Sequence, residues 1–190
     1  MPRIVVVRHG NTFAPGEPVL RIGARTDPPL VESGRAQAAA LRERFAALGW
    51  RFDRVLAGPL RRTRESAALI VGVEPGIADW LAEIDHGPDE GRPEEDVAAR
   101  VGRAALDRWD REAIAPVGWI VDAEARVPAW HAAFATADDL LLVTSNGAAR
   151  FALLALGEQP EGGLKLRTGA YGVIETAPPR LVEWDVRPES

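Results

Sequence analysis

The chain has 190 residues, 46% of them apolar and 27% charged, which fits one well-buried core and predicts a single domain over residues 1–190. Its net charge of −5 argues against a general binder of nucleic acid or of a membrane surface. The lack of cysteine excludes disulfides, thiolate metal sites and cysteine-nucleophile phosphatases, and the lack of a signal peptide or long apolar stretch makes the cytoplasm the expected compartment.

The first element in chain order is a continuous β-branched run, Ile4–Val7, which is typical of a strand buried on both faces in a parallel sheet. A loop rich in Pro and Gly follows from about Thr12 to Pro29. Val31–Leu48 then has apolar residues on one helical face and charged residues on the other, so a helix is predicted there, with Gly49 at its C-terminal cap.

The middle of the chain alternates between short strands and helices. Arg54–Ala57 is a predicted strand, Leu60–Val71 a helix, and Ile77–Trp80 a third short strand. His86–Pro93 is a loop rich in turn residues. Glu94–Ala113 carries apolar side chains at helical spacing, so one long helix is predicted over that range.

The last third begins with an irregular segment, Pro116–Val127, and a short predicted helix, Ala129–Ala137. Leu140–Thr144 is the second strongly apolar strand and leads through Ser145-Asn146-Gly147 into a helix, Ala148–Leu156. Two closing strands are predicted at Tyr171–Glu175 and Leu181–Val186.

This alternation predicts an α/β fold, a three-layer α/β/α sandwich with a mixed, mostly parallel sheet. In such sheets, ligands bind at the carboxyl ends of the strands, where helix N-termini also point. Three polar clusters follow strand ends in this chain: Arg8-His9-Gly10-Asn11, Arg61-Arg62 and Ser145-Asn146-Gly147. Their convergence predicts a functional site at one edge of the sheet.

The cluster after the first strand has the chemistry of a phosphoryl acceptor. His9 directly follows a buried strand, so the sheet fixes its position. Neutral imidazole attacks phosphorus and later leaves readily, Arg8 offers a planar fork for phosphate oxygens, and Gly10 lets the backbone approach an anion. The alternative interpretation is a strand-end histidine that only hydrogen-bonds the backbone.

Four segments together resemble the histidine phosphatase superfamily, which contains cofactor-dependent phosphoglycerate mutases and many small phosphatases. They are Arg8-His9-Gly10-Asn11-Thr12, the loop and helix start from Arg21 to Ala38, the arginine motif from Gly58 to Ala67, and the acid segment from Leu81 to Gly91. Each segment alone is weak evidence, but four in order at suitable distances are specific. The resemblance covers roughly Pro2 to Leu156.

The resemblance implies that His9 is transiently phosphorylated, while Arg8 and Arg62 hold the phosphoryl oxygens with help from Asn11. Glu83 would protonate the leaving alcohol and then activate water. No metal and no cofactor is required, because the arginines neutralise the charge. The substrate is expected to be a small phosphorylated molecule.

Two of these assignments have rivals nearby in the sequence. Arg62 is preferred to Arg61, because it precedes a small residue and lies four before Ser66, as in the family motif. Glu83 sits between apolar neighbours, and near a bound phosphate and in partial burial its pKa should rise, which suits a general acid. Asp85 and Glu90 are the alternatives. Asp85 is expected to orient the loop.

The last motif departs from the family, because Asn146 stands where a second histidine is expected. Loss of a charged donor at a developing oxyanion costs roughly 10²–10³ in rate. The chain is then a slow enzyme, an enzyme with altered substrate or a phosphate-binding protein. Asn146 contacts the ligand or is only a helix N-cap. Arg21 and His86 are further candidates for substrate contact.

The sequence thus predicts a phosphatase that hydrolyses phosphomonoesters through phosphohistidine on His9, with Glu83 as acid and base. The alternative from another class is a catalytically weak phospho-ligand binding or regulatory protein, motivated by Asn146. A mutase is the less favoured alternative, because 190 residues hardly accommodate the insertions that mutases carry.

Overall fold

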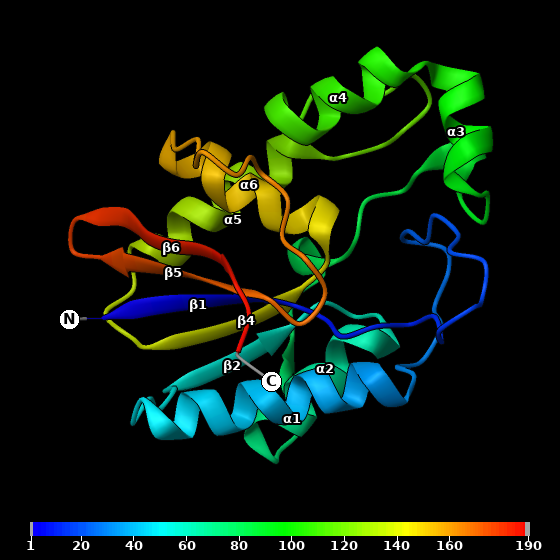
Figure 1. Ribbon diagram of the computed structural model, residues 1–190. Coiled ribbons are helices and arrows are strands. Elements are labelled where there is room, and N and C mark those ends of the chain that lie inside the picture. The colour runs from blue at the N-terminus through cyan, green and yellow to red at the C-terminus, as the bar shows by residue number, and fades with distance from the viewer. Residues whose placement is uncertain (1, 189–190) are drawn as a thin grey trace.

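The computed structural model describes residues 2–188 and contains one six-stranded mixed sheet with helices on both faces (Figure 1). The strand order is β3-β2-β4-β1-β5-β6. The neighbours β3, β2, β4 and β1 pair in parallel, β5 pairs antiparallel with β1, and β6 pairs antiparallel with β5. The predicted sandwich with a mostly parallel sheet is confirmed. The strands are β1 (Arg3–Arg8), β2 (Arg54–Ala57), β3 (Gly76–Ile77), β4 (Leu140–Thr144), β5 (Tyr171–Thr176) and β6 (Pro179–Val186).

The two central strands are apolar throughout because the helix layers cover both of their faces. β1 pairs with β4 so that Val5 faces Leu141 across the ladder, and both side chains are fully buried. Alternate residues of these strands enter two separate cores. One core contains Val5 and lies under α1 (Glu32–Ala47) and α2 (Arg61–Val71).

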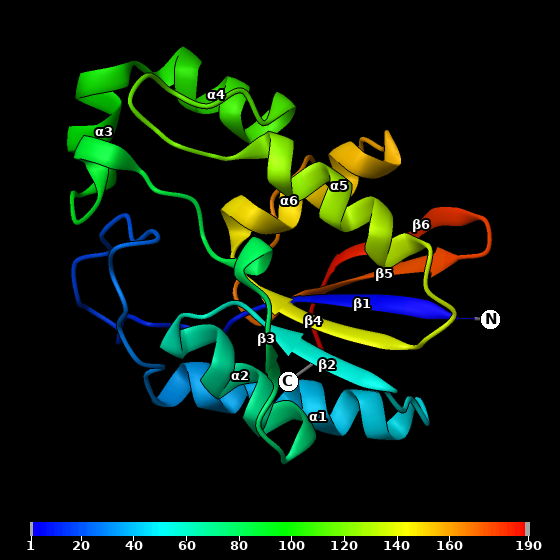
Figure 2. The same ribbon diagram turned by 180° about the vertical axis from the view of Figure 1, so that it is seen from behind.

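The opposite core contains Ile4 and lies under α5 (Ala123–Phe134) and α6 (Asn146–Leu156). Figure 2 shows this layer from behind, with α3 (Glu94–Val101) and α4 (Arg103–Glu112) extending beyond it over one end of the sheet. That end holds the carboxyl termini of the parallel strands β1, β2 and β4. The second core therefore carries the elements that overhang the predicted site.

The predicted long helix Glu94–Ala113 is wrong, because two helices occupy that range. The chain breaks at Gly102, whose φ of 82° lies in the left-handed region that favours glycine. The break turns α4 away from α3 and lets Trp109 pack into the core. The apolar spacing was compatible with either arrangement, so Gly102 was the deciding residue.

Two further elements differ from the prediction. Helix α5 begins at Ala123, within the segment Pro116–Val127 expected to be irregular, and accommodates Pro128 in its interior. The predicted strand Ile77–Trp80 is only the two-residue β3, followed by a 3₁₀ turn at Asp79–Leu81. No helix among residues 2–188 is long and apolar enough to cross a membrane.

Two loops lie side by side over the carboxyl edge of the sheet. Arg21 donates its backbone N–H to the carbonyl of Arg92 at 2.8 Å and accepts from the N–H of Gly91 at 2.7 Å. Leu20 and Pro93 form an isolated antiparallel bridge beside these bonds. The Pro- and Gly-rich loop after β1 is thus fixed to the loop that carries the predicted acid.

Candidate active site

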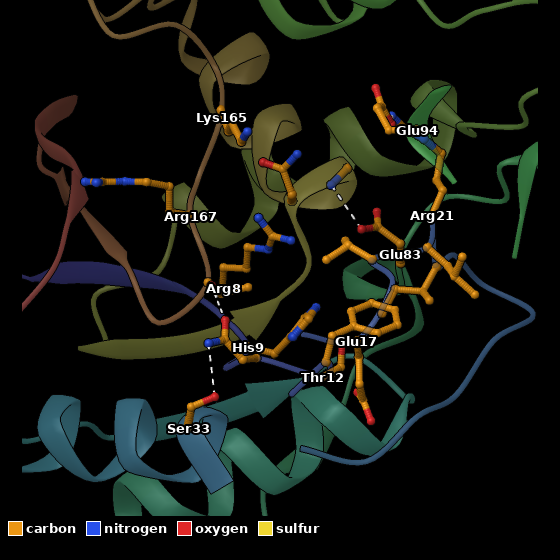
Figure 3. A pocket seen from close by; sticks show the side chains of 18 of the residues that line it. Arg8, His9, Thr12, Glu17, Arg21, Ser33, Glu83, Glu94, Lys165 and Arg167 are labelled. Atoms are coloured by element: carbon orange, nitrogen blue, oxygen red, sulfur yellow. Dashed lines mark hydrogen bonds and ion pairs between the residues drawn. The ribbon is translucent and has the colours of Figure 1, made fainter. Parts of the chain in front are cut away.

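A cavity of about 840 Å³ opens at the carboxyl edge of the sheet (Figure 3). Seven of the eight residues predicted for the site line it, and the eighth, Arg62, is fully buried and does not. The seven are Arg8, His9, Asn11, Arg21, Glu83, His86 and Asn146. The fold thus brings together residues from four separate motifs, 138 positions apart at the extremes.

His9 is held at the end of β1 by its backbone and by its ring. Its N–H donates to the carbonyl of Thr144 at 3.0 Å, and Nδ1 lies 2.7 Å from the carbonyl oxygen of Gly10. A carbonyl only accepts, so Nδ1 carries the proton and Nε2 keeps a lone pair. Burial, together with Arg8 and Arg62, holds the pKa of His9 well below 6.5, so the ring is neutral.

Gly10 allows the site to pack directly on α1. A side chain on Gly10 would begin 2.3 Å from the carbonyl oxygen of Gly34 in that helix. The N–H of Gly10 donates to the hydroxyl of Ser66 at 3.1 Å, and that hydroxyl donates to the carbonyl of Arg62 at 2.8 Å. This chain of bonds fixes the His9 loop relative to α2.

Two arginines flank His9, of which Arg62 is fully buried and Arg8 is partly buried. Arg8 donates from Nη1 to the carbonyl of Leu166 at 2.9 Å, and burial lowers its pKa to about 10. Arg62 donates to the carbonyls of Thr26 at 2.6 Å and Gly23 at 3.1 Å, and its pKa is also lowered by burial. The Nε atoms of both arginines are buried without a partner in the described part of the chain.

The neighbouring arginine has a different environment. The side chain of Arg61 is 60% exposed and pairs with Glu65 at 2.5 Å on the outer face of α2. Of these two arginines, only Arg62 therefore lies close enough to His9 and Glu83 to lower their pKa values. This difference follows from the helix, in which adjacent side chains point about 100° apart.

Glu83 approaches the cavity from the loop after β3, and its side chain is held by backbone amides. Its Oε1 accepts from the N–H of Ile84 at 2.9 Å, and its Oε2 accepts from the N–H of Gly147 at 3.3 Å. The two rival carboxylates do not line the cavity. Asp85 accepts from Arg25 and from the N–H of Gly87, and Glu90 from Thr26, so both brace the loop.

The rise in the pKa of Glu83 is expected beside a bound phosphate, and the free protein shows the opposite direction. Burial acts to raise it, but His86, the N–H groups of Ile84 and Gly147, and Arg62 outweigh burial, and the pKa lies below its ordinary value. Burial also lowers the pKa of His86 to about 4, so His86 is neutral near pH 7. At that pH the amide groups and Arg62 stabilise the carboxylate.

Asn146 is the first residue of α6, and its side chain faces the loop before β5. Ser145 occupies the N-cap position, so the N-cap interpretation of Asn146 is wrong. Its Oδ1 accepts from the N–H of Leu166 at 2.9 Å. Its Nδ2 has no hydrogen-bond partner among residues 2–188 and is available as a donor at the cavity.

The remaining candidates line the cavity with side chains that are already partly engaged. Asn11 donates to the hydroxyl of Ser33 at 3.2 Å and accepts from Thr168 at 2.6 Å. Arg21 forms an ion pair with Glu94, and its guanidinium lies 4.8 Å from the ring centre of Trp119. These contacts join separate walls of the cavity.

His86 packs against the same tryptophan. Its ring centroid lies 4.6 Å from that of Trp119, with the rings nearly perpendicular, and its Nδ1 is buried without a partner among the described residues. Sequence reasoning missed the cations from the C-terminal part, which line the cavity outside any motif: Lys165, Arg167 and Arg187. One signal was available, since Lys165 is the only lysine of the chain.

The arrangement combines a neutral imidazole, a carboxylate and guanidinium groups around one cavity. Such a site can accept a phosphoryl group on nitrogen and move a proton on the opposite side. Within residues 2–188, no group of three or more His, Asp or Glu side chains is placed to hold a metal ion.

Comparison with solved structures shows the same fold in several phosphatases. The chain superimposes on the mycobacterial glucosyl-3-phosphoglycerate phosphatase with a TM-score of 0.79 at 23% identity, covering 98% of this chain and 100% of the other. The α-ribazole phosphatase from Shigella flexneri gives a TM-score of 0.72 at 21% identity, covering 99% and 98%. A protein from Thermus thermophilus gives 0.71 at 27% identity, covering 96% and 98%.

A curated relative matches part of the chain. It is the 2,3-bisphosphoglycerate-dependent phosphoglycerate mutase from Methylobacterium sp. (strain 4-46), 38% identical over 91 residues. The match spans 45% of this chain and 44% of that enzyme. The family sequence model of the histidine phosphatase superfamily (branch 1) matches residues 4–182, which is nearly the whole chain. The protein therefore belongs to the histidine phosphatase superfamily.

Proposed function

We propose that the protein hydrolyses small phosphomonoesters through a phosphohistidine on His9, without a metal or a cofactor. The observation that carries this proposal is the state of His9: the ring is neutral, its Nδ1 proton is bound to Gly10, and Nε2 is left as a nucleophile. Arg8 and Glu83 line the same cavity. Membership of the superfamily and the phosphatases among the structural neighbours support hydrolysis in general.

In the first step, the lone pair of His9 Nε2 attacks phosphorus and the bond from phosphorus to the ester oxygen breaks. Glu83 delivers its proton to that oxygen, so the leaving group departs as a neutral alcohol. Glu83 is ionised in the free protein near pH 7. The negative phosphoryl group raises its pKa on binding, and the proton comes from the substrate monoanion or from solvent.

In the second step, Glu83 acts as a base. Its carboxylate takes a proton from water while the water oxygen attacks phosphorus, and the bond from phosphorus to Nε2 breaks to release phosphate. Arg8, which lines the cavity, supplies positive charge to the phosphoryl oxygens, and the buried Arg62 behind it adds fixed positive charge to the site. Asn11 and Asn146 add neutral donors, with Arg21 and His86 beside the leaving group.

Asn146 favours a second candidate, a phospho-ligand binding protein with little turnover. The amide donates a hydrogen bond through Nδ2 but carries no charge, so it stabilises a developing oxyanion less than an imidazolium does. The partial match to a mutase favours a third candidate, a phosphotransferase that retains the phosphoryl group. All three candidates use His9 and Arg8 to bind phosphate, and they differ in the fate of the phosphoryl group.

One experiment separates the three candidates. The protein is incubated with a panel of phosphomonoesters, released phosphate is measured, and the acid-quenched and base-quenched protein is tested for acid-labile phosphate. Hydrolysis predicts phosphate release and a labile phosphoryl group that both disappear in His9→Ala. Turnover that survives His9→Ala contradicts the mechanism. Phosphate binding without turnover on any substrate favours the binding protein, and transfer to a second substrate favours the phosphotransferase.

A further inference from the structure

Lys165 lines the cavity without an ion-pair partner among residues 2–188. Among the described residues, none of the carboxylates that line the cavity forms an ion pair with Lys165, and each has another partner. The pairs are Glu17 with the N–H of Ala14, Glu83 with the N–H groups of Ile84 and Gly147, Glu94 with Arg21, and Asp110 with Arg150. The charge of Lys165 is therefore available to a ligand.

The backbone beneath Lys165 is rigidly anchored. Leu164 and Leu166 on either side are 2% and 0% exposed, so the side chain between them projects outward. Leu166 donates its N–H to Asn146 and accepts at its carbonyl from Arg8. Lys165 thus rises from the same stretch of backbone that connects two of the residues proposed to bind the phosphoryl group.

The other cationic side chains that line the cavity differ in how fully they are engaged by ion pairs and hydrogen bonds. Arg167 makes three contacts to Asp185, at 2.6, 2.6 and 3.0 Å, and Figure 3 shows its guanidinium directed away from His9. Arg21 is bound to Glu94. Within the described part of the chain, Arg187 makes one hydrogen bond, to Thr168 at 3.5 Å, and its charge acts on Arg8. Lys165 and Arg187 therefore remain as accessible positive charges.

We propose that Lys165, with Arg187, binds a second anionic group on the alcohol portion of the substrate. This inference rests on the proposed phosphatase function and defines its substrate class, phosphomonoesters that also carry a carboxylate or a second phosphate. A cavity of about 840 Å³ leaves room for such a leaving group beside the phosphoryl group. An ammonium on a flexible stem suits an anion whose position varies with the substrate, unlike the rigid fork of arginine.

The test uses two matched substrate pairs. Phosphoserine and phosphoethanolamine differ only by a carboxylate, and fructose 1,6-bisphosphate and fructose 6-phosphate differ only by a phosphate. The measured quantity is the ratio of kcat/KM within each pair, for the wild type, Lys165→Gln, Lys165→Glu and Lys165→Arg. Arg42→Gln is the charge-matched control, because Arg42 is exposed on α1, on the opposite face of the sheet.

We expect the wild type to prefer the more anionic member of at least one pair, and that pair identifies the group as carboxylate or phosphate. Lys165→Gln lowers the preference by up to about fivefold, the upper limit for one exposed charge pair. Lys165→Glu lowers it further, whereas Lys165→Arg and Arg42→Gln retain it. A wild type without preference, or a preference that Lys165→Gln leaves intact, overturns the inference.

Failure of the proposed function has a different signature. It gives no phosphate release from any of the four compounds or from p-nitrophenyl phosphate. Calorimetric binding of the same pairs to wild type and Lys165→Gln then decides the role of Lys165. Tighter binding of the anionic member that disappears in Lys165→Gln supports the anion site, and equal affinities overturn it.

Discussion

Glu83 accepts a hydrogen bond from the backbone N–H of Gly147 at 3.3 Å, and a side chain on Gly147 would begin 2.1 Å from Oε1 of the same carboxylate. The acid loop and the start of α6 are therefore in direct contact, although 64 residues separate them. The close approach depends on glycine at position 147 and fixes the direction of the Glu83 carboxylate.

Gly147→Ala should displace Glu83 and lower kcat by about 10²-fold, the lower limit of what a positioned acid contributes. The protein should remain folded, with a loss of about 1–3 kcal/mol in the free energy of unfolding from overpacking. Phosphate release and urea unfolding measure the two effects. Gly162→Ala is the control, because a methyl group there meets no atom within 4 Å. Wild-type kcat in Gly147→Ala would show that the contact does not position the acid.

Glu83→Gln should affect poor and good leaving groups differently. For an alkyl phosphate, loss of the acid should lower kcat by about 10²–10⁴. p-Nitrophenolate leaves without protonation, so phosphorylation of His9 should persist while the water-activating base of the second step is missing. A burst of nitrophenolate followed by slow turnover is therefore expected in stopped-flow measurements. Equal losses on both substrates without a burst contradict the dual role of Glu83.

The sequence was informative wherever a local pattern had one structural solution. The boundaries of Arg54–Ala57 and Leu140–Thr144 were predicted as the structure has them, because turn residues delimit both apolar runs. Helical spacing alone could not locate the break at Gly102, and Pro128 argued against the helix turns that precede it. In α5 tertiary packing overrode the local preference, whereas the break between α3 and α4 follows the preference of Gly102 for positive φ.

The residues of the site that belong to sequence motifs could be predicted, whereas those outside the motifs could not. The motifs predicted that His9 and Glu83 share one site, and both line the same cavity. The hydrogen bonds of Glu83, however, include one from Gly147, which is distant in the sequence. Partial burial beside a bound phosphate suggested a raised pKa, whereas in the free protein His86 and the amide contacts lower it. Lys165 and Arg187 lie in segments without motifs, and only the return of β5 and β6 beside β1 places them at the cavity.

Arg62→Lys should lower both stability and activity, whereas Arg61→Lys should change neither by much. Arg62 uses its two Nη groups to bind the carbonyls of Thr26 and Gly23, and an ammonium cannot reproduce that planar fork. We expect a loss of about 1.5–3 kcal/mol in the free energy of unfolding, the range for a charged hydrogen bond, and a much lower kcat/KM. Urea unfolding and phosphate release measure both variants.

The outcome also tests which arginine serves the site. Arg61 is exposed and pairs with Glu65, so its replacement should shift stability by less than about 0.5 kcal/mol. If Arg61→Lys loses activity and Arg62→Lys does not, the phosphate contact belongs to Arg61 instead.

Acidification should destabilise the protein partly through His86. Its pKa is about 4 in the folded protein because of burial, against about 6.5 in an unfolded chain. Between these values the unfolded chain binds a proton that the folded protein does not, so stability falls as the pH drops from 6.5 toward 4. The full effect is on the order of 3 kcal/mol, and His9 acts in the same direction.

His86→Phe removes this proton while keeping an aromatic ring against Trp119. Urea unfolding of the wild type and the variant at pH 7.5 and pH 4.5 gives the comparison. At pH 7.5 the imidazole is neutral in both states, so any difference there reports packing alone. The variant should lose less stability than the wild type between the two pH values. An equal loss in both proteins would show that His86 takes up its proton in the folded state and is not held neutral by burial.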